Sequence, residues 1–79
     1  MQLRRRFARN LQKARAHREL TQERLADLSG LAVRHLQKIE AGEVNLTLLS
    51  IAAIADALGC EPRDLLGRPE EFSIGKKRN

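Results

Sequence analysis

The sequence is poor in several features that particular functions require. It contains two Phe and no Trp or Tyr, so it lacks the aromatic platforms on which single-stranded nucleic acids stack their bases. Its one cysteine, Cys60, excludes an internal disulfide and favours an intracellular location. No apolar run approaches the ~18 residues of a membrane span, and no apolar segment follows Arg4–Arg6 as one would in a signal peptide. We therefore expect no membrane association.

Groups for metal binding and for catalysis are also sparse. His17, His35 and Cys60 are scattered, so we expect no metal site, and we interpret Cys60 as a small packing residue. The three residues offer no set of nucleophile, base and orienting group, which argues against an enzyme. The 79 residues form one small domain without a separate ligand domain, so we expect no cofactor and no small-molecule ligand.

Acidic residues are absent from both ends of the chain. Residues 1–18 hold seven basic groups and residues 73–79 hold three, whereas all ten acids lie between these segments. The formal net charge is +5 and the sequence pI is about 10.4. Basic surface of this kind favours binding to nucleic acid or to an anionic membrane. Solvated ends that only keep the protein soluble are the alternative explanation.

Helical patterns fill the chain, and strand patterns are absent. An apolar stripe predicts a first helix over about residues 4–18. Thr21 is a predicted N-cap for a helix over 22–29, which Gly30 ends. A third helix is expected over about 32–41, ended by Gly42. The first stripe consists of Leu3, Phe7, Leu11 and Ala14.

The second half of the chain continues this pattern. Thr47 and Gly59 bound a fourth predicted helix, and Pro62 opens a short fifth helix over 62–66. The expected core face of the fourth helix consists of Leu48, Ile51, Ala52, Ala55 and Leu58. We predict an all-α domain over residues 1–66, a compact bundle of five helices, followed by a basic, loosely ordered tail over 67–79.

Residues 22–42 form the segment that indicates function. Two short helices, over about 22–29 and 32–40, meet at a turn that contains Gly30. Such a pair crosses near a right angle and can present its second helix to a major groove. Leu25, Leu31, Leu36 and Ile39 are expected to face the core. The second helix would then turn outward Val33, Arg34, Gln37 and Lys38, with His35 on the flank; these include donors that read guanine and adenine edges.

At this point the sequence resembles the phage-repressor-like, or Xre-type, helix-turn-helix DNA-binding proteins. The resemblance covers about residues 4–66. It is carried by LTQERLA at 20–26, Gly30-Leu31, IEAG at 39–42 and IADALG at 54–59. The family implies a lambda-repressor-like domain of five helices that usually works as a dimer. The short length and the loop at 45–47 are also similar to the controller proteins of restriction–modification systems.

The resemblance implies roles for individual residues. Val33, Arg34 and Lys38 would face base edges. Phosphate contacts or contacts beside the bases would come from Gln22, His35, Gln37 and Asn45. Arg15 and Glu40 match a structural ion pair between the first and third helices. The sequence departs from the family pattern at Ala32, which replaces a hydroxyl cap, at Val33, which replaces a polar reader, and at Leu28, where a polar residue is usual.

Simpler interpretations stay open for several of these residues. Arg34 and Lys38 are also explained as solvated surface groups, and Gln22 as a good helix opener. His35 is equally compatible with a surface histidine that has no role. Arg4–Arg6 are either a diffuse electrostatic arm or a disordered segment.

One apolar stripe exceeds what a monomer requires. Leu49, Ala53 and Ala57 recur at i, i+4 and i+8 beside the expected core face of the fourth helix. A helix that is apolar around most of its girth needs a partner, so this stripe predicts a homodimer interface. The alternative is packing under the tail through Phe72 or Ile74.

Together these features predict a homodimeric, sequence-specific regulator of transcription that binds a palindromic operator in double-stranded DNA. The region around Gln22 would dock on phosphates while the helix over 32–39 lies in the major groove. We expect it in the prokaryotic cytoplasm, at the nucleoid when it is bound to DNA. The alternative is an antitoxin or adaptor that mainly binds a partner protein, which a longer ordered tail would favour.

Overall fold

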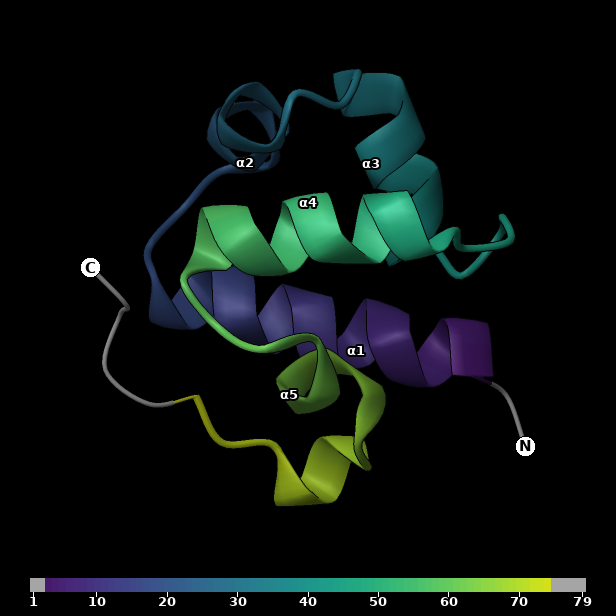
Figure 1. The fold of residues 1–79 in the computed structure, drawn as a ribbon, viewed down its shortest axis with the longest axis vertical. Coiled ribbons are helices and arrows are strands. Elements are labelled where there is room, and N and C mark those ends of the chain that lie inside the picture. Colours follow the sequence, from purple (N-terminus) through teal and green to yellow (C-terminus); the bar gives the residue numbers. More distant parts are fainter. Residues whose placement is uncertain (1–2, 75–79) are drawn as a thin grey trace.

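Five α-helices and one short 3₁₀ helix make up the computed structural model, which describes residues 3–74 (Figure 1). The helices are α1 (Leu3–His17), α2 (Gln22–Ser29), α3 (Val33–Glu40), α4 (Leu48–Leu58), α5 (Pro62–Leu66) and the 3₁₀ helix η1 (Pro69–Glu71). No strand occurs in this part of the chain. The predicted all-α class with five helices is confirmed.

The helix boundaries follow from capping chemistry. The hydroxyl oxygens of Thr21 and Thr47 accept hydrogen bonds from the third backbone N–H of α2 and of α4, each at 3.0 Å. Gly30 ends α2 with a φ of 76°, a left-handed conformation that glycine adopts without steric cost. Helix α3 begins after Ala32, which makes no side-chain cap. Its methyl group has no acceptor, so this start lacks a contribution of about 1 kcal/mol.

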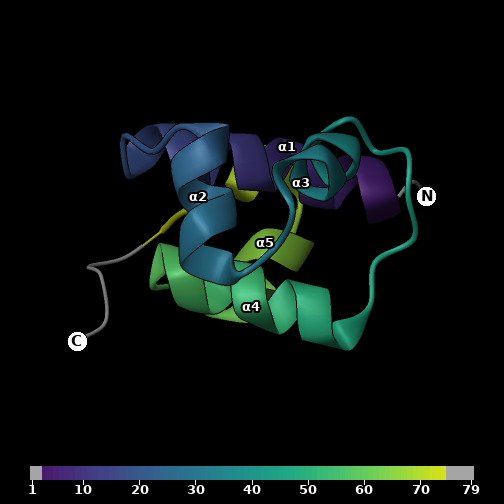
Figure 2. The ribbon, with the colours of Figure 1, turned by 90° about the horizontal axis from the view of Figure 1, so that it is seen from above.

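The five helices pack around one core. Helix α1 packs against α3 and α5, and α2 packs against α3 and α4. Figure 2 shows α4 on the opposite side of the molecule from α1 and α3, with α5 between the two sides. The space between them is filled by side chains with no exposed surface, namely Phe7, Leu11, Leu25, Leu36, Ile54, Leu58 and Leu65.

The predicted core face of α4 was partly wrong. Leu48 is 85% exposed and Ala52 is also exposed, whereas Ile54 is completely buried. The observed core stripe is Ile51, Ile54, Ala55 and Leu58, which follows the helical period of 3.6 residues. Leu48 lies one turn before this stripe, at the end of α4 that projects beyond α5 (Figure 2).

Residues 67–74, where the sequence predicts the start of a loosely ordered tail, contact α1 and the core in the structure. The side-chain amide of Asn10 in α1 donates to the carbonyls of Leu65 and Gly67, at 2.9 and 2.7 Å. The 3₁₀ helix follows, and Phe72 and Ile74 pack against the core. The tail is ordered because its apolar residues and backbone carbonyls find partners on α1. The rest of the predicted tail, 75–79, lies outside the described residues.

A partly buried ion pair joins α1 to the end of α3. The guanidinium of Arg15 donates to both carboxylate oxygens of Glu40, at 2.8 and 3.1 Å, and also to the carbonyl of Leu20 at 2.9 Å. Gln12 donates to the backbone carbonyl of Glu40 at 2.8 Å. Arg15 and Glu40 are the two residues for which the family resemblance implies a structural pair. Their contacts set the position of α3 relative to α1.

We expect the removal of this pair to destabilise the fold strongly. Arg15→Ala should lower the free energy of unfolding by about 3 kcal/mol, because it leaves the Glu40 charge buried without its partner. Glu40→Ala should cost less, because the side chain of Arg15 is 23% exposed and that of Glu40 only 5%. Chemical denaturation of the purified variants measures both effects.

The exposed pair of Arg24 and Asp27 provides the matched control. Their side chains are 59% and 77% exposed, and the ion pair is 3.3 Å long. Arg24→Ala should cost less than about 1 kcal/mol, because water already solvates both charges. Equal destabilisation at the two pairs would contradict the structural role assigned to Arg15 and Glu40.

Candidate nucleic-acid interface

Helices α2 and α3 are joined by a three-residue turn that sets one across the other (Figures 1 and 2). The N–H groups of Gly30 and Leu31 both donate to the carbonyl of Ala26, which closes the end of α2. Ala26 is 4% exposed, and its small side chain allows the two helices to approach closely. Leu31 packs against the core and anchors the turn. The outer side of α3 is therefore held in a defined orientation.

One side of α3 is apolar and buried, and the other is exposed and free of acidic groups. Leu36 and Ile39 face the core, with 0% and 2% exposure. We call the exposed side the recognition face; it consists of Val33, Arg34, Gln37 and Lys38. His35 lies at its edge and is half-buried. The outward orientation that the sequence predicts for these residues is therefore present in the fold.

The electrostatics of the recognition face follow from the ion pair. Glu40 is the one acidic residue of α3, and its carboxylate turns inward to Arg15. Arg34 and Lys38 lie one helical turn apart, and within residues 3–74 neither forms an ion pair. The face therefore presents two positive charges, neither of which is paired with a carboxylate in this part of the chain.

Gln22 connects the ion pair to the recognition face. Its side-chain amide donates to a carboxylate oxygen of Glu40 at 3.1 Å, and its carbonyl oxygen lies 3.5 Å from the amide nitrogen of Gln37. The family resemblance implies a phosphate contact for Gln22 but no link to Gln37. The sequence contains a partial indication of this link. Gln37 and Glu40 are three residues apart on one helix, so a residue that contacts Glu40 can also reach Gln37.

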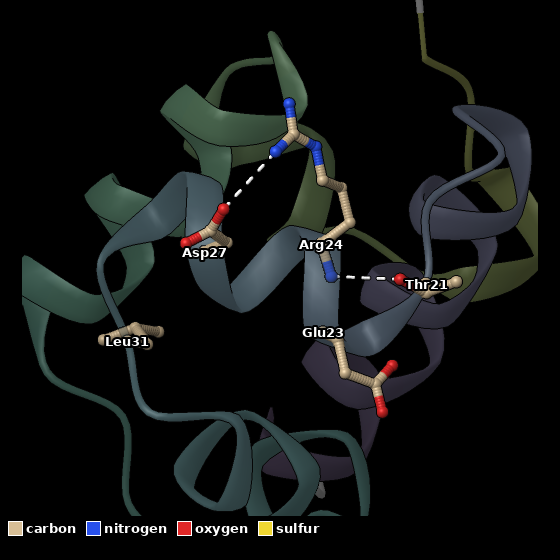
Figure 3. Close-up of a pocket in the computed structure, with 5 residues that line it drawn as sticks. All are labelled: Thr21, Glu23, Arg24, Asp27 and Leu31. Carbon is tan, nitrogen blue, oxygen red and sulfur yellow. Dashed lines mark hydrogen bonds and ion pairs between the residues drawn. The ribbon is translucent and has the colours of Figure 1, made fainter.

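The outer side of α2 carries charges of the opposite sign. An open hollow there is lined by Thr21, Glu23, Arg24, Asp27 and Leu31 (Figure 3). The guanidinium of Arg24 pairs with Asp27, while the carboxylate of Glu23 points away from that pair. Two carboxylates against one guanidinium disfavour phosphate.

The basic groups of residues 1–18 do not form one uniform arm. Residues 3–6 are the first turn of α1, and Arg6 donates to the carbonyl of Leu66 at 3.4 Å. Lys13 and Arg18 also donate to backbone carbonyls, those of Pro69 and Leu58. The exposed basic groups that make no such contact are Arg4, Arg5 and Arg9. Arg5 lies against Gly42, which follows the end of α3. The exposed arginines of α1 therefore include one that is close to the end of α3.

The remaining candidate residues lie in the loop before α4 and along that helix. Asn45 is exposed in the loop that joins α3 to α4. Leu49 is 84% exposed, whereas Ala53 and Ala57 are half-buried. Ala57 packs against the core, as do Phe72 and Ile74, so the predicted stripe is exposed mainly at its first residue.

Other kinds of site find little support in the part of the chain described. Within residues 3–74, no three His, Cys, Asp or Glu side chains are placed to hold a metal ion. Cys60 is a buried core residue, 4% exposed. None of the described helices has both the length and the apolar character needed to cross a membrane.

Comparison with known proteins identifies the family. The helix-turn-helix family model HTH_3 matches residues 11–65. The uncharacterized HTH-type transcriptional regulator y4dJ of Sinorhizobium fredii (strain NBRC 101917 / NGR234) is 29% identical over 77 residues, which cover 98% of this chain and 100% of the relative. A crystal structure of the restriction-modification controller protein C.AhdI from Aeromonas hydrophila is 39% identical and superimposes with a TM-score of 0.76. The match covers 78% of this chain and 94% of the controller.

The family match and the geometry of residues 22–42 agree. The match includes α2, the turn at Gly30 and α3, together with all but the last residue of α5. The resemblance to Xre-type proteins is confirmed. The chain belongs to the helix-turn-helix family, whose members are DNA-binding regulators of transcription.

Proposed function

We propose that the protein binds a palindromic operator in double-stranded DNA as a homodimer and regulates transcription from it, acting by binding and not by catalysis. The observation that carries the proposal is the recognition face, with its exposed polar groups and no outward carboxylate. An α-helix with such a face fits the major groove, and its cations attract phosphates. The names of the two relatives, a transcriptional regulator and a restriction-modification controller, support a role in transcription.

The proposed contacts follow from the side chains on this face. Arg34 and Lys38 donate to O6 and N7 of guanine, and the methyl groups of Val33 meet the methyl group of a thymine. Gln22 at the start of α2, His35 at the edge of α3 and Asn45 in the following loop approach the flanking phosphates. The phosphate contacts set the register of the protein on DNA, and the base contacts select the sequence.

Two copies are needed for useful discrimination, because one domain presents only one short helix to the groove. A two-fold dimer places two recognition helices about 34 Å apart, on the same side of the duplex. Leu49 is the centre of the proposed dimer contact, because it is the most exposed residue of the stripe. Burying one leucine side chain contributes about 2 kcal/mol. Ala53 lies one turn along and lets a partner helix approach, and Ala57 extends the stripe.

A longer ordered tail would favour the antitoxin or adaptor alternative. Residues 67–74 do form contacts, but with α1 and the core of the same chain. The proposed location is the prokaryotic cytoplasm, at the nucleoid when the protein is bound to DNA.

Arg34 provides the direct test of the recognition face. Arg34→Ala should weaken binding to the operator by about 1–3 kcal/mol and relax the preference at one base position in each half-site, because alanine cannot make the bidentate contact to guanine. Titration of operator and scrambled duplexes measures the change in affinity. Arg63→Ala, which removes an exposed arginine from α5, is the control and should leave both affinities unchanged. Equal weakening on both duplexes would mean that Arg34 contacts only phosphate.

The exposed arginines of α1 are tested by salt dependence. Arg4→Gln and Arg5→Gln keep the helix intact, whereas deletion of residues 1–6 would remove its first turn. The double variant with Arg4→Gln and Arg5→Gln should weaken specific and non-specific DNA binding by the same factor. The slope of log affinity against log salt should become less steep by about 0.9 for each phosphate that the variant no longer neutralises. An unchanged slope would show that this end of α1 does not meet DNA.

Sedimentation of Leu49→Glu tests the dimer. Like charges would face each other across the two-fold axis, so the variant should shift toward the 8.9 kDa monomer and bind the operator more weakly. The monomer should stay folded, because Leu49 makes little contact with the core. Leu28→Glu makes the same change at an exposed position of α2 and should leave the dimer intact. A Leu49→Glu protein that remains a dimer would place the interface elsewhere.

A further inference from the structure

Two polar side chains of α1 hold the end of α5 and the segment that follows it. The side-chain NH₂ group of Asn10 donates to the carbonyl of Leu65 at 2.9 Å and to that of Gly67 at 2.7 Å. Lys13, about one turn further along α1, donates to the carbonyl of Pro69 at 2.6 Å. The last carbonyls of a helix have no partner within the helix itself. Helix α1 therefore supplies from outside the donors that the end of α5 lacks.

Asn10 occupies a position in the core. It has no exposed surface, and it lies on α1 between Phe7 and Ala14, which are also completely buried. Its side-chain oxygen is buried too and accepts no hydrogen bond from any group within residues 3–74. A buried amide oxygen without a donor is unfavourable, and both hydrogens of the amide are already used. Asn10 thus stabilises the end of α5 through its NH₂ group and loses part of that gain through its oxygen.

The other contacts of residues 67–74, which we call the strap, lie near solvent. The hydrogen bond from Lys13 is exposed, and Phe72 and Ile74 pack against the core but are only half-buried. Within the part of the chain that the structure describes, Asn10 is the one completely buried side chain that donates to the strap. Segments with exposed hydrogen bonds and few buried apolar contacts open at a lower free energy than the core of a protein.

We propose that the strap opens as one unit while the five-helix domain stays folded, and that Asn10 is the latch that sets how often it opens. Opening lets water reach the oxygen of Asn10 and the carbonyls of Leu65 and Gly67. It therefore relieves one unfavourable burial and breaks hydrogen bonds that water replaces. Opening also uncovers the surface of the core against which Phe72 and Ile74 pack.

The strap lies away from the helix-turn-helix. Figure 1 shows the 3₁₀ helix η1, in yellow, at the opposite end of the molecule from α2 and α3. The family match ends at residue 65, so the strap also lies outside the part of the chain that matches the family model. Opening of the strap therefore leaves the recognition face in place. The inference goes beyond the proposed function, because it gives the domain a surface that is covered in one state and accessible in the other.

Hydrogen exchange of the full chain measures the opening of the strap. The backbone N–H groups of Glu71 and Phe72 donate within the 3₁₀ turn, so opening of the strap releases them to exchange. The N–H of Leu25 in α2, a residue without exposed surface, exchanges only when the domain itself opens. In the wild type, the two strap amides should be measurably protected, by a factor roughly a hundredfold or more below that of Leu25.

Two variants and a matched control test the role of the latch. Asn10→Leu keeps the volume of the side chain and removes both donors, so the protection of the strap amides should fall about tenfold or more while Leu25 stays strongly protected. Lys13→Gln removes the exposed anchor and should lower strap protection by a smaller factor, about threefold. Arg9→Gln is the control. Arg9 lines the hollow between α1 and the strap but forms no hydrogen bond within residues 3–74, so strap protection should stay unchanged.

Cleavage by chymotrypsin provides an independent measurement. The chain contains two Phe, and Phe7 is completely buried in α1, so cleavage after Phe72 reports the open strap. Mass spectrometry of the early products measures its rate. The rate should increase in Asn10→Leu by the same factor as hydrogen exchange, because both follow the population of the open form. In Arg9→Gln it should equal the rate of the wild type.

Three results would overturn the inference. The first is strap amides with the same protection as Leu25, which would mean that the strap opens only when the whole domain unfolds. The second is strap amides without any protection in the wild type, since no closed state would then exist. The third is a folded Asn10→Leu variant with unchanged strap protection. If Asn10→Leu does not fold, equal strap protection in Lys13→Gln and Arg9→Gln overturns the inference instead. None of these measurements involves DNA, so the proposed function is tested separately.

Discussion

The partly buried ion pair between Arg15 and Glu40 is the interaction that holds the recognition face in place. Helix α3 has only eight residues and begins without a side-chain cap, so its own hydrogen bonds do little to fix its position. Leu36 and Ile39 hold its inner side, and the bonds from Arg15 hold its end. Gln22 adds a second contact to Glu40, from the start of α2. The pair therefore positions both helices of the motif.

Glu40 takes no part in the surface that α3 presents. It lies two residues from Lys38 and six from Arg34, on the other side of the helix, because residues two apart do not share a helical face. Turned inward, it neutralises Arg15 and leaves two cations exposed. The acids of α2 stay on another side, where Asp27 is paired with Arg24. An acidic middle segment can thus coexist with a basic recognition face, because the fold sorts charges that are close together in the sequence.

The helical elements and the motif could be predicted from the amino-acid sequence alone. Thr21, Thr47 and the left-handed glycines act on their nearest neighbours in the chain, so the helix boundaries could be predicted to within about two residues. The outward orientation of Val33, Arg34, Gln37 and Lys38 followed from helical periodicity once Leu36 and Ile39 were assigned to the core. These predictions succeeded because capping and periodicity depend on residues a few positions apart.

The packing of the helices, in contrast, determined which surfaces were covered and which polar groups met. Leu48 has the right period for the core of α4 but is exposed as the first residue of that helix, and periodicity does not show how far neighbouring helices cover a face. The order of residues 67–74 depends on Asn10 and Lys13, more than fifty residues away. The contact between Gln22 and Gln37 needs two helices at a particular crossing. Each outcome depends on atoms that are far apart in the chain and adjacent in space, and local sequence patterns carry no information about such distances.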